Sequence, residues 1–314
     1  MHNGGNANYK SFNTPEQLSR YSSVSKRDGK AYDLRYNGQS VALVTCTKKK
    51  GIILKPNIEN ARNFGFLFDE EEIKSETVEW EWKKSRASSF RSFFKNKAQY
   101  SENYSQPEHR LENRLLRLFT SKEKPFRIQP VRLYNCFFQM PTPLSASKHE
   151  ELPKYSRDKG GGIDILSRFT PRDRVEGENS RLCVMELKDE IKKNENQDDA
   201  IGQAIAYAVF IAKLLRSESG QDWWNFFMNR EEGNQSDKST KLRDVSNVHD
   251  IEVVTIMPWG ETEEFCNQEV KLQELGITLH CHSLYYDDSI YKKGKGKIQF
   301  IKGSFIEEVI LTKK

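Results

Sequence analysis

The sequence contains few cysteines, and none of them lies in a close pair. The five cysteines, at positions 46, 136, 183, 266 and 281, are odd in number and form no C-x-x-C motif. This pattern disfavours a disulfide-stabilised secreted scaffold, a zinc ribbon and a cysteine-ligated iron–sulfur cluster. We therefore expect a reducing, cytoplasmic setting.

Long hydrophobic runs and a strong charge excess are also lacking. Residues 1–30 are polar and contain no apolar core of a signal peptide. The most apolar stretch, Ala200 to Leu215, is sixteen residues long and includes Gln203 and Lys213. Since a membrane-spanning helix needs about 20 apolar residues, we expect no membrane association. Fifty Lys and Arg against 45 Asp and Glu give a net charge of +5, which permits an anionic partner without requiring one.

The chain has 314 residues, among them 18 Phe, 12 Tyr and 5 Trp. This number of aromatic residues is too high for a disordered protein. The length fits one large domain or two smaller ones. Within residues 1–100, strand patterns at Ala31–Tyr36, Ser40–Thr47 and Thr77–Trp82 predict a β-rich accessory region, with an Asn-Gly hairpin turn between the first two. Residues 101–314 mix strands with helices and predict an α/β domain.

The segment 83–97 combines six Lys or Arg residues with three phenylalanines and contains no acid. One interpretation is a solvated linker whose phenylalanines pack inward. The other is a segment that follows phosphates while Phe90, Phe93 and Phe94 stack on bases. We favour the linker, because phenylalanine side chains are more often buried than exposed on the surface.

A helix is predicted to follow this segment. Ser105-Gln-Pro-Glu108 has the form of a capping box, and the apolar residues behind it recur at helical spacing through residue 119. Glu108 is explained as the N3 residue of that box. Glu112, one turn later, has no such local role.

The rest of the chain alternates between strand and helix patterns. The predicted elements, in order, are the strands Arg127–Phe138, Gly162–Phe169 and Leu182–Lys188, the helix Asp199–Arg216, and the strands Ile251–Met257 and Ile277–Tyr285. The third strand is apolar on both faces, which is typical of a central strand. Yet it ends in two charged residues.

These two charged residues, together with Asp164, are candidates for a functional site. Glu186 and Lys188 are two apart and therefore point the same way, and Asp164 lies on the preceding strand, its predicted hairpin neighbour. Ionised groups at the end of a buried strand are costly unless they are paired or bind a metal. Two carboxylates and an ammonium at one point suit phosphoryl hydrolysis assisted by Mg²⁺.

An E-x-K pattern alone carries little information, since the chain contains five, and an ordinary salt bridge at a strand end explains most such patterns. Only Glu186/Lys188 ends a fully apolar strand and follows a Gly-x-Asp strand. The helix after it adds Gln203 and Tyr207, which are four apart and share one face. In so apolar a helix, Gln203 needs a buried partner.

Together, Gly162-x-Asp164, Glu186-x-Lys188 and Gln203-x-x-x-Tyr207 resemble the motifs of the PD-(D/E)XK nuclease superfamily, and more narrowly of its RecB-like branch, over about residues 105–285. The resemblance implies a restriction-endonuclease-like mixed β-sheet core flanked by helices. It also implies a Mg²⁺- or Mn²⁺-dependent deoxyribonuclease.

The resemblance further implies a role for each matching residue. Asp164, Glu186 and the backbone carbonyl of Leu187 would bind the metal, and Glu112 would match the helix carboxylate that reaches the metal or its waters. Lys188 would assist the nucleophilic water. On the helix, Gln203 and Tyr207 would orient the site and touch the nucleic-acid backbone.

Several alternatives stay open. The chain could instead be a non-catalytic nucleic-acid-binding module on a nuclease fold, or an unrelated α/β protein whose motifs coincide by chance. DNA versus RNA, endonuclease versus exonuclease action, sequence specificity, and a homodimer or partner protein of a larger system are all undecided. Roles in restriction, defence against mobile elements or repair are analogies. Two smaller expectations are that Gly160-Gly161-Gly162 lets the backbone approach a neighbour or the substrate closely, in preference to cradling a phosphate, and that His280 and His282 share a strand face.

Overall fold

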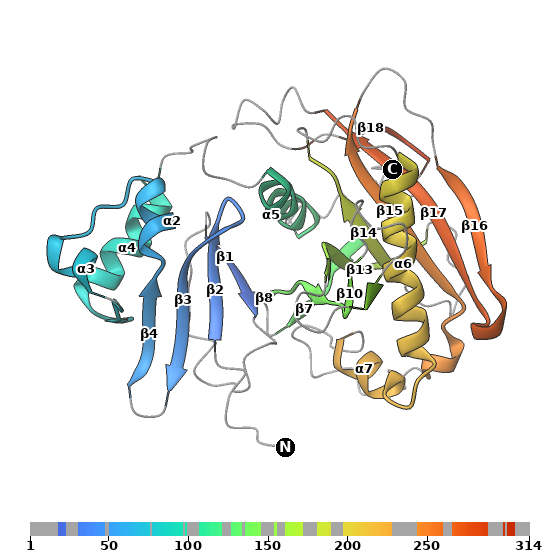
Figure 1. Ribbon diagram of the computed structural model, residues 1–314, viewed down its shortest axis with the longest axis horizontal. Coiled ribbons are helices and arrows are strands. Elements are labelled where there is room, and N and C mark those ends of the chain that lie inside the picture. Colours follow the sequence, from blue (N-terminus) through green and yellow to red (C-terminus); the bar gives the residue numbers. More distant parts are fainter. Residues whose placement is uncertain are drawn as a thin grey trace. The chain divides into compact units, whose positions relative to one another are not determined.

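The computed structural model divides the chain into two compact units (Figure 1). Unit 1 comprises Met1–Asn113 and Cys136–Phe138, and unit 2 comprises Arg114–Asn135 and Gln139–Lys314. The residues that the structure describes are 18–22, 31–47, 50–75, 77–96, 98, 107–120, 127–133, 136–145, 154–155, 161–171, 181–189, 197–227, 244–259, 266–287, 298 and 300–304.

A mixed sheet forms the centre of unit 1. Its strands are β1 (Leu18–Ser22), β2 (Ala31–Tyr36), β3 (Gln39–Thr47), β4 (Gly51–Pro56), β5 (Trp80–Glu81) and β8 (Cys136–Phe137). They lie in the order β5-β4-β3-β2-β1-β8, and β8 runs parallel to β1 while the other neighbours are antiparallel. The predicted β2–β3 hairpin is confirmed: Asn37 and Gly38 form its turn at φ values of 48° and 81°, which an Asn-Gly pair tolerates.

Three helices described in unit 1 are α2 (Ile58–Asn63), α3 (Glu70–Lys74) and α4 (Ser85–Asn96). Helix α4 shows that the linker interpretation of residues 83–97 is wrong. Ala87, Phe90 and Phe94 are buried on one face of α4, and both phenylalanines join the aromatic core of unit 1. Their spacing of three and four residues is that of a helix face. Only the expectation that phenylalanines of this segment pack inward is confirmed.

A second mixed sheet forms the centre of unit 2. Its strands are β6 (Ile128–Pro130), β13 (Ile165–Phe169), β14 (Arg181–Leu187), β15 (Asp250–Pro258), β16 (Asn267–Leu272), β17 (Ile277–Tyr286) and β18 (Phe300–Gly303). They lie in the order β6-β13-β14-β15-β17-β16, with β18 also beside β17. β14, β15 and β17 are parallel, and the remaining pairs are antiparallel. β14 lies in the middle of this order, as its apolar sequence predicts.

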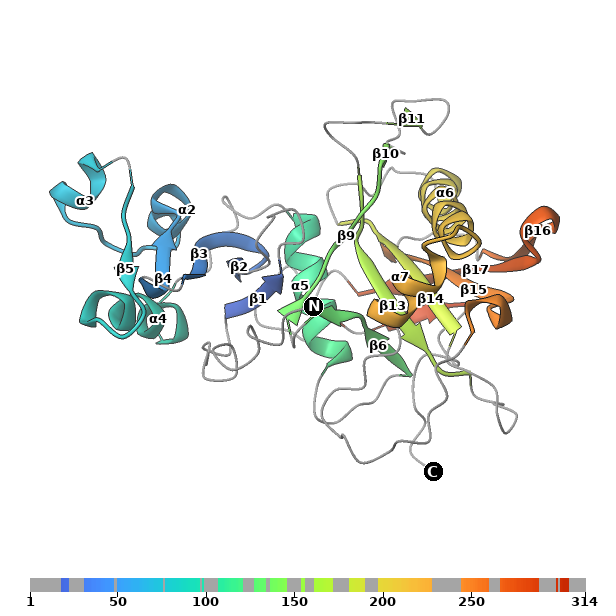
Figure 2. The same cartoon turned by 90° about the horizontal axis from the view of Figure 1, so that it is seen from below.

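Helix α6 (Gln197–Leu215) connects β14 to its parallel neighbour β15 and is followed by α7 (Gly220–Phe227). It packs against β14, β15 and β17 and covers one face of the sheet (Figures 1 and 2). The predicted helix is confirmed to within two residues. No single helix in the described part of the chain is long and apolar enough to cross a membrane; α6 and α7 satisfy those criteria only jointly, as a pair bent by 112°.

Both units thus combine a mixed β-sheet with flanking helices, which confirms the predicted mixed α/β class. The predicted single strand Arg127–Phe138 is wrong. It divides into β6, β7 (Arg132–Leu133) and β8, and β6 belongs to the sheet of unit 2 whereas β8 belongs to that of unit 1. Proline at position 130 has no N–H to donate, so a regular ladder ends there.

Short strand pairs surround the segment that carries Asp164. The predicted strand Gly162–Phe169 divides into β12 (Gly162–Ile163) and β13, with Asp164 between them. β12 pairs with β9 (Met140–Pro141), and β10 (Leu144–Ser145) pairs with β11 (Lys154–Tyr155). The chain therefore changes its pairing partner at Asp164.

Helix α5 (Pro107–Phe119) has the predicted bounds. Ser105 and Gln106 of the predicted capping box lie outside the described residues. The division between the units falls within α5, after Asn113, and differs from the boundary expected at residue 100. The units also differ from the prediction at strand β8, which follows the helix in sequence but pairs with β1 of the first sheet.

Candidate active site

The hairpin of β13 and β14 places Asp164 beside the end of β14. The antiparallel register pairs Ile165 with Met185, so Asp164, one residue earlier, stands opposite Glu186. Oδ2 of Asp164 accepts a hydrogen bond from the backbone N–H of Leu187 at 2.8 Å. Because Leu187 follows Glu186 directly, the two carboxylates belong to one end of the hairpin.

Lys188 links this hairpin to helix α6. Its Nζ donates to Oε1 of Glu186 at 3.0 Å and to Oε1 of Gln203 at 2.9 Å. The side chains of Glu186 and Lys188 are only 3% and 4% exposed. A buried charge is tolerated when it is paired and hydrogen-bonded, and both conditions are met by these contacts. The buried partner expected for Gln203 is therefore Lys188.

Tyr207 lies one turn beyond Gln203 on α6 and is buried. Burial raises the pKa of its hydroxyl, the charges of Glu186 and Asp164 raise it further, and a hydrogen bond with Gln203 lowers it. The amide oxygen of Gln203 accepts from Lys188, and Gln203 is also hydrogen-bonded to Tyr207.

Glu112, the third predicted catalytic carboxylate, is a residue of unit 1. Its contacts there are ion pairs with Arg35, at 4.0 Å to a terminal nitrogen, and with Nδ1 of His109, at 3.5 Å. Arg35 also pairs with Asp33 at 2.8 Å and lies 4.1 Å from the ring centroid of Tyr21. The structure thus groups Asp164, Glu186, Lys188, Gln203 and Tyr207 in unit 2, and it groups Glu112 with residues of unit 1.

The donor set of unit 2 fits a hard divalent cation. Asp164 and Glu186 supply carboxylate oxygens, and the hydrogen bonds described above use one oxygen of each. The backbone carbonyl of Leu187 is a further oxygen at the same strand end. No group of three or more His, Cys, Asp or Glu side chains in the described ranges is arranged to hold a metal. Mg²⁺ needs no such group, because it binds through one or two carboxylates and keeps several waters.

Two residues near the site were missed by the sequence reasoning. Asp189 directly follows Lys188 and is only 4% exposed. The sequence did contain a signal for Asp189, because it is the third charged residue, after Glu186 and Lys188, at the end of an apolar strand. The hydroxyl of Tyr286 donates to the backbone carbonyl of Lys188 at 3.2 Å. No local pattern could reveal this contact, because the two residues are 98 positions apart.

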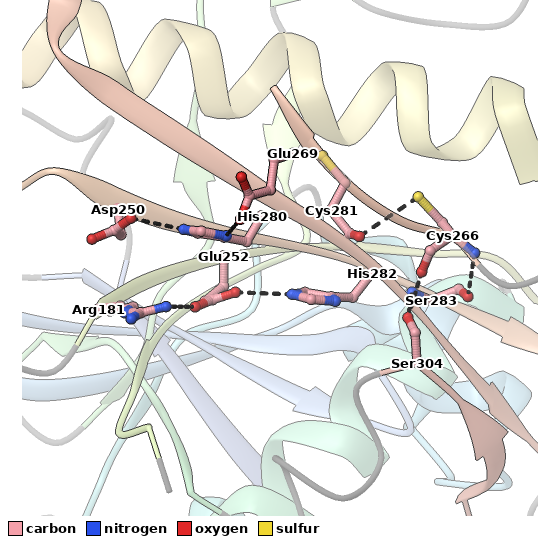
Figure 3. A network of polar contacts seen from close by, with 10 residues as sticks. All are labelled: Arg181, Asp250, Glu252, Cys266, Glu269, His280, Cys281, His282, Ser283 and Ser304. Atoms are coloured by element: carbon pink, nitrogen blue, oxygen red, sulfur yellow. Dashed lines mark hydrogen bonds and ion pairs between the residues drawn. The ribbon is translucent and has the colours of Figure 1, made fainter. Parts of the chain in front are cut away.

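A second polar cluster lies on the other face of the same sheet (Figure 3). Side chains alternate along a strand, and Glu252 precedes Thr255, the register partner of Glu186, by three residues. Glu252 therefore points away from the face that carries Glu186. It accepts from Arg181 at 2.8 Å and contacts Nε2 of His282 at 3.1 Å.

The prediction that His280 and His282 share a strand face is confirmed by their contacts in this cluster. His280 lies between two carboxylates, with Nε2 at 2.7 Å from Asp250 and Nδ1 at 3.3 Å from Glu269. The cluster joins side chains of β14, β15, β16 and β17. These contacts stabilise the sheet away from the candidate site.

Comparisons of the chain with protein-family models, with curated proteins and with solved structures found no match. The assignment of a function therefore rests on the chemistry of the side chains that unit 2 brings together. Fold class alone would not supply it, because one fold hosts many activities.

Proposed function

We propose that this protein is a metal-dependent nuclease that hydrolyses DNA phosphodiester bonds with a metal-activated water. The observation that carries the proposal is the buried contact of Lys188 with both Glu186 and Gln203. At the same strand end, Asp164 accepts a hydrogen bond from the backbone N–H of Leu187. An ordinary salt bridge at a strand end explains Glu186 and Lys188. It does not explain why a third charged group and a glutamine from α6 converge on them.

The proposal includes a restriction-endonuclease-like core in unit 2. An antiparallel hairpin, a covering helix and a parallel strand follow one another as β13, β14, α6 and β15. This order supports that core, and α5 precedes it in the chain. The acidic residue expected on that preceding helix is Glu112. Because its ion pairs are with residues of unit 1, the proposal does not include Glu112 among the metal ligands.

In this proposal Asp164, Glu186 and the Leu187 carbonyl hold Mg²⁺ or Mn²⁺. When bound, the cation lowers the pKa of a water and offsets charge that develops on the phosphate. Lys188 contributes an ammonium whose position is fixed by Glu186 and Gln203. It donates a hydrogen bond to the attacking water or to a phosphate oxygen, where a preorganised charge lowers the barrier most.

A gel cleavage assay tests the proposal. Linear duplex, circular duplex, single-stranded DNA and RNA are incubated with Mg²⁺, with Mn²⁺ or with EDTA. We expect cleavage of DNA that requires the cation, is lost in EDTA and returns when Mg²⁺ is added in excess. Cutting of the circular duplex would identify an endonuclease.

Two matched pairs of variants locate the activity. Lys188→Met and Asp164→Asn are expected to lower the cleavage rate by about 100-fold or more, the usual effect of removing a charge-stabilising group. Lys213→Met and Asp199→Asn change exposed residues of α6 and should leave it unchanged. Unaltered cleavage by Lys188→Met would contradict the proposal. Salt-sensitive DNA binding without cation-dependent turnover would instead support the non-catalytic module.

A further inference from the structure

A glycine next to the candidate site lies against the hydroxyl of Tyr207. Gly161 directly precedes β12, three residues before Asp164. A Cβ atom at this position would overlap with the hydroxyl oxygen of Tyr207 and lie 3.2 Å from its Cζ. The two segments approach this closely only because residue 161 has no side chain. The close approach predicted from the glycine run is therefore found here.

The backbone of Gly161 has little freedom to move away. Its N–H donates to the carbonyl of Leu144 at 2.7 Å. Its own carbonyl accepts from the N–H of Thr142 at 2.9 Å and from the hydroxyl of Thr142 at 3.2 Å. An added methyl group would therefore displace the Tyr207 side chain.

Tyr207 is held from the other side by α6. It is buried and hydrogen-bonded to Gln203, whose amide oxygen accepts from Lys188. A continuous set of contacts therefore runs from Gly161 through Tyr207, Gln203 and Lys188 to Glu186.

We propose that Gly161 is a positioning residue of the candidate site. The absence of a side chain at position 161 seats the Tyr207 hydroxyl against the segment that leads to Asp164, and so fixes α6 relative to that segment. Gln203 then presents its oxygen to Lys188 at the observed position. The consequence for catalysis rests on the proposed nuclease function, whereas the contact itself does not.

A double-mutant cycle tests the contact without any activity measurement. Thermal unfolding is measured for Gly161→Ala, Tyr207→Phe and the double variant, because phenylalanine removes the nearest of the atoms that the new methyl group would meet. We expect Gly161→Ala to lower the melting temperature by roughly 4 °C or more in the Tyr207 protein. The loss should be at most half as large in the Tyr207→Phe protein. Equal losses in the two backgrounds would overturn the proposal.

A neighbouring glycine is the matched control. A Cβ at Gly162 would lie 3.4 Å from the side chain of Gln139, close to ordinary contact, so Gly162→Ala should cost clearly less than Gly161→Ala. If Gly161→Ala does not fold, folding of the double variant supports the proposal. Failure of both to fold contradicts it, since the Leu144 carbonyl, 2.9 Å from the added Cβ, would then explain the loss.

A spectroscopic readout distinguishes positioning from a general loss of structure. With ¹³C-labelled tyrosine, the Cζ resonance of Tyr207 is assigned by its absence in Tyr207→Phe and followed against pH. We expect the Gly161→Ala protein to show a shifted resonance and a lower titration midpoint, because the displaced hydroxyl is less buried. An unchanged resonance in a folded variant would refute the displacement.

Measuring DNA cleavage shows whether the positioning role of Gly161 and the proposed nuclease function hold independently of each other. If the protein cleaves DNA, Gly161→Ala should lower kcat by about tenfold or more at a similar KM, as small misplacements of a site do. Coupling in the cycle without cleavage by the unmodified protein would contradict the nuclease and keep the positioning role. Cleavage without coupling would contradict the positioning role and keep the nuclease.

Discussion

At the scale of single residues, the candidate site is defined by charges removed from water. Glu186 and Lys188 are almost fully buried and contact each other at 3.0 Å. Removing two ions from water costs several kcal/mol, and their attraction offsets this cost only when the geometry is good. With two apolar residues of similar size at these positions, the protein would be expected to be at least as stable. Stability alone therefore does not account for the charged pair.

Removing one member of the pair should therefore be worse than removing both. Lys188→Met leaves the Glu186 carboxylate buried beside no ammonium, and we expect the free energy of unfolding to fall by about 3–5 kcal/mol. Glu186→Gln/Lys188→Met should recover most of that loss. Urea unfolding followed by fluorescence measures both values.

The control for this comparison is Lys213→Met on the exposed face of α6, which should change stability by no more than ~0.5 kcal/mol. A double variant that is no more stable than Lys188→Met would refute the interpretation that each buried charge is tolerated because of the other.

At the scale of elements, α6 performs two tasks. Its buried residues cover the sheet, and Gln203 and Tyr207 extend toward the end of β14. Sequence features in this helix follow from these tasks: alanines allow close packing on the strands, and the two polar residues share one face. Gly202, which precedes Gln203, serves neither task, because it is exposed and a Cβ there would meet nothing within 4 Å.

Gly202→Ala should stabilise the protein. Alanine loses less backbone entropy than glycine in a helix, and we expect a gain of about 0.5–1 kcal/mol in the free energy of unfolding. Chemical denaturation measures it. Gly220→Ala is the opposite control, because a Cβ at the start of α7 would overlap with the carbonyl of Leu215. A loss of stability in Gly202→Ala would contradict the described environment of residue 202.

At the scale of the whole molecule, unit 1 is built from two separate stretches of the chain. β8 follows α5 in sequence but pairs with β1, with Tyr21 opposite Phe137. The rings of these residues lie 5.7 Å apart between centroids. Unit 1 is therefore completed by residues that come after the helix at which the two units divide.

Phe137→Ala should loosen unit 1 selectively. The loss of the ring removes buried apolar contact from β1, and we expect faster hydrogen exchange of amides in β1 and β2 with unchanged protection in β14 and β15. Mass spectrometry of peptides from each strand measures this. Phe226→Ala, which alters an exposed phenylalanine of unit 2, is the control and should leave the amides of β1 unaffected. Equal acceleration in both sheets would contradict two separate cooperative units.

The sequence by itself determined those features that depend on local periodicity. Alternation and turn chemistry predict β2 and β3, a continuous apolar run predicts β14, and helical spacing predicts α5 and α6. Strand alternation places Glu186 on the same side as Lys188, and helical spacing places Gln203 on the face of Tyr207. Helix α4 was also encoded in this way, by Ala87, Phe90 and Phe94, and was missed because the basic residues between them favoured a solvated linker.

Only the tertiary structure decided which distant segments meet. The return of β8 to β1, the ion pairs of Glu112 with Arg35 and His109, and the contact of Gly161 with Tyr207 each join residues that no local repeat connects. Such contacts depend on how well two remote surfaces fit and on the entropy of closing the chain between them. A local pattern records which face of an element is buried, but it does not record the partner that buries it.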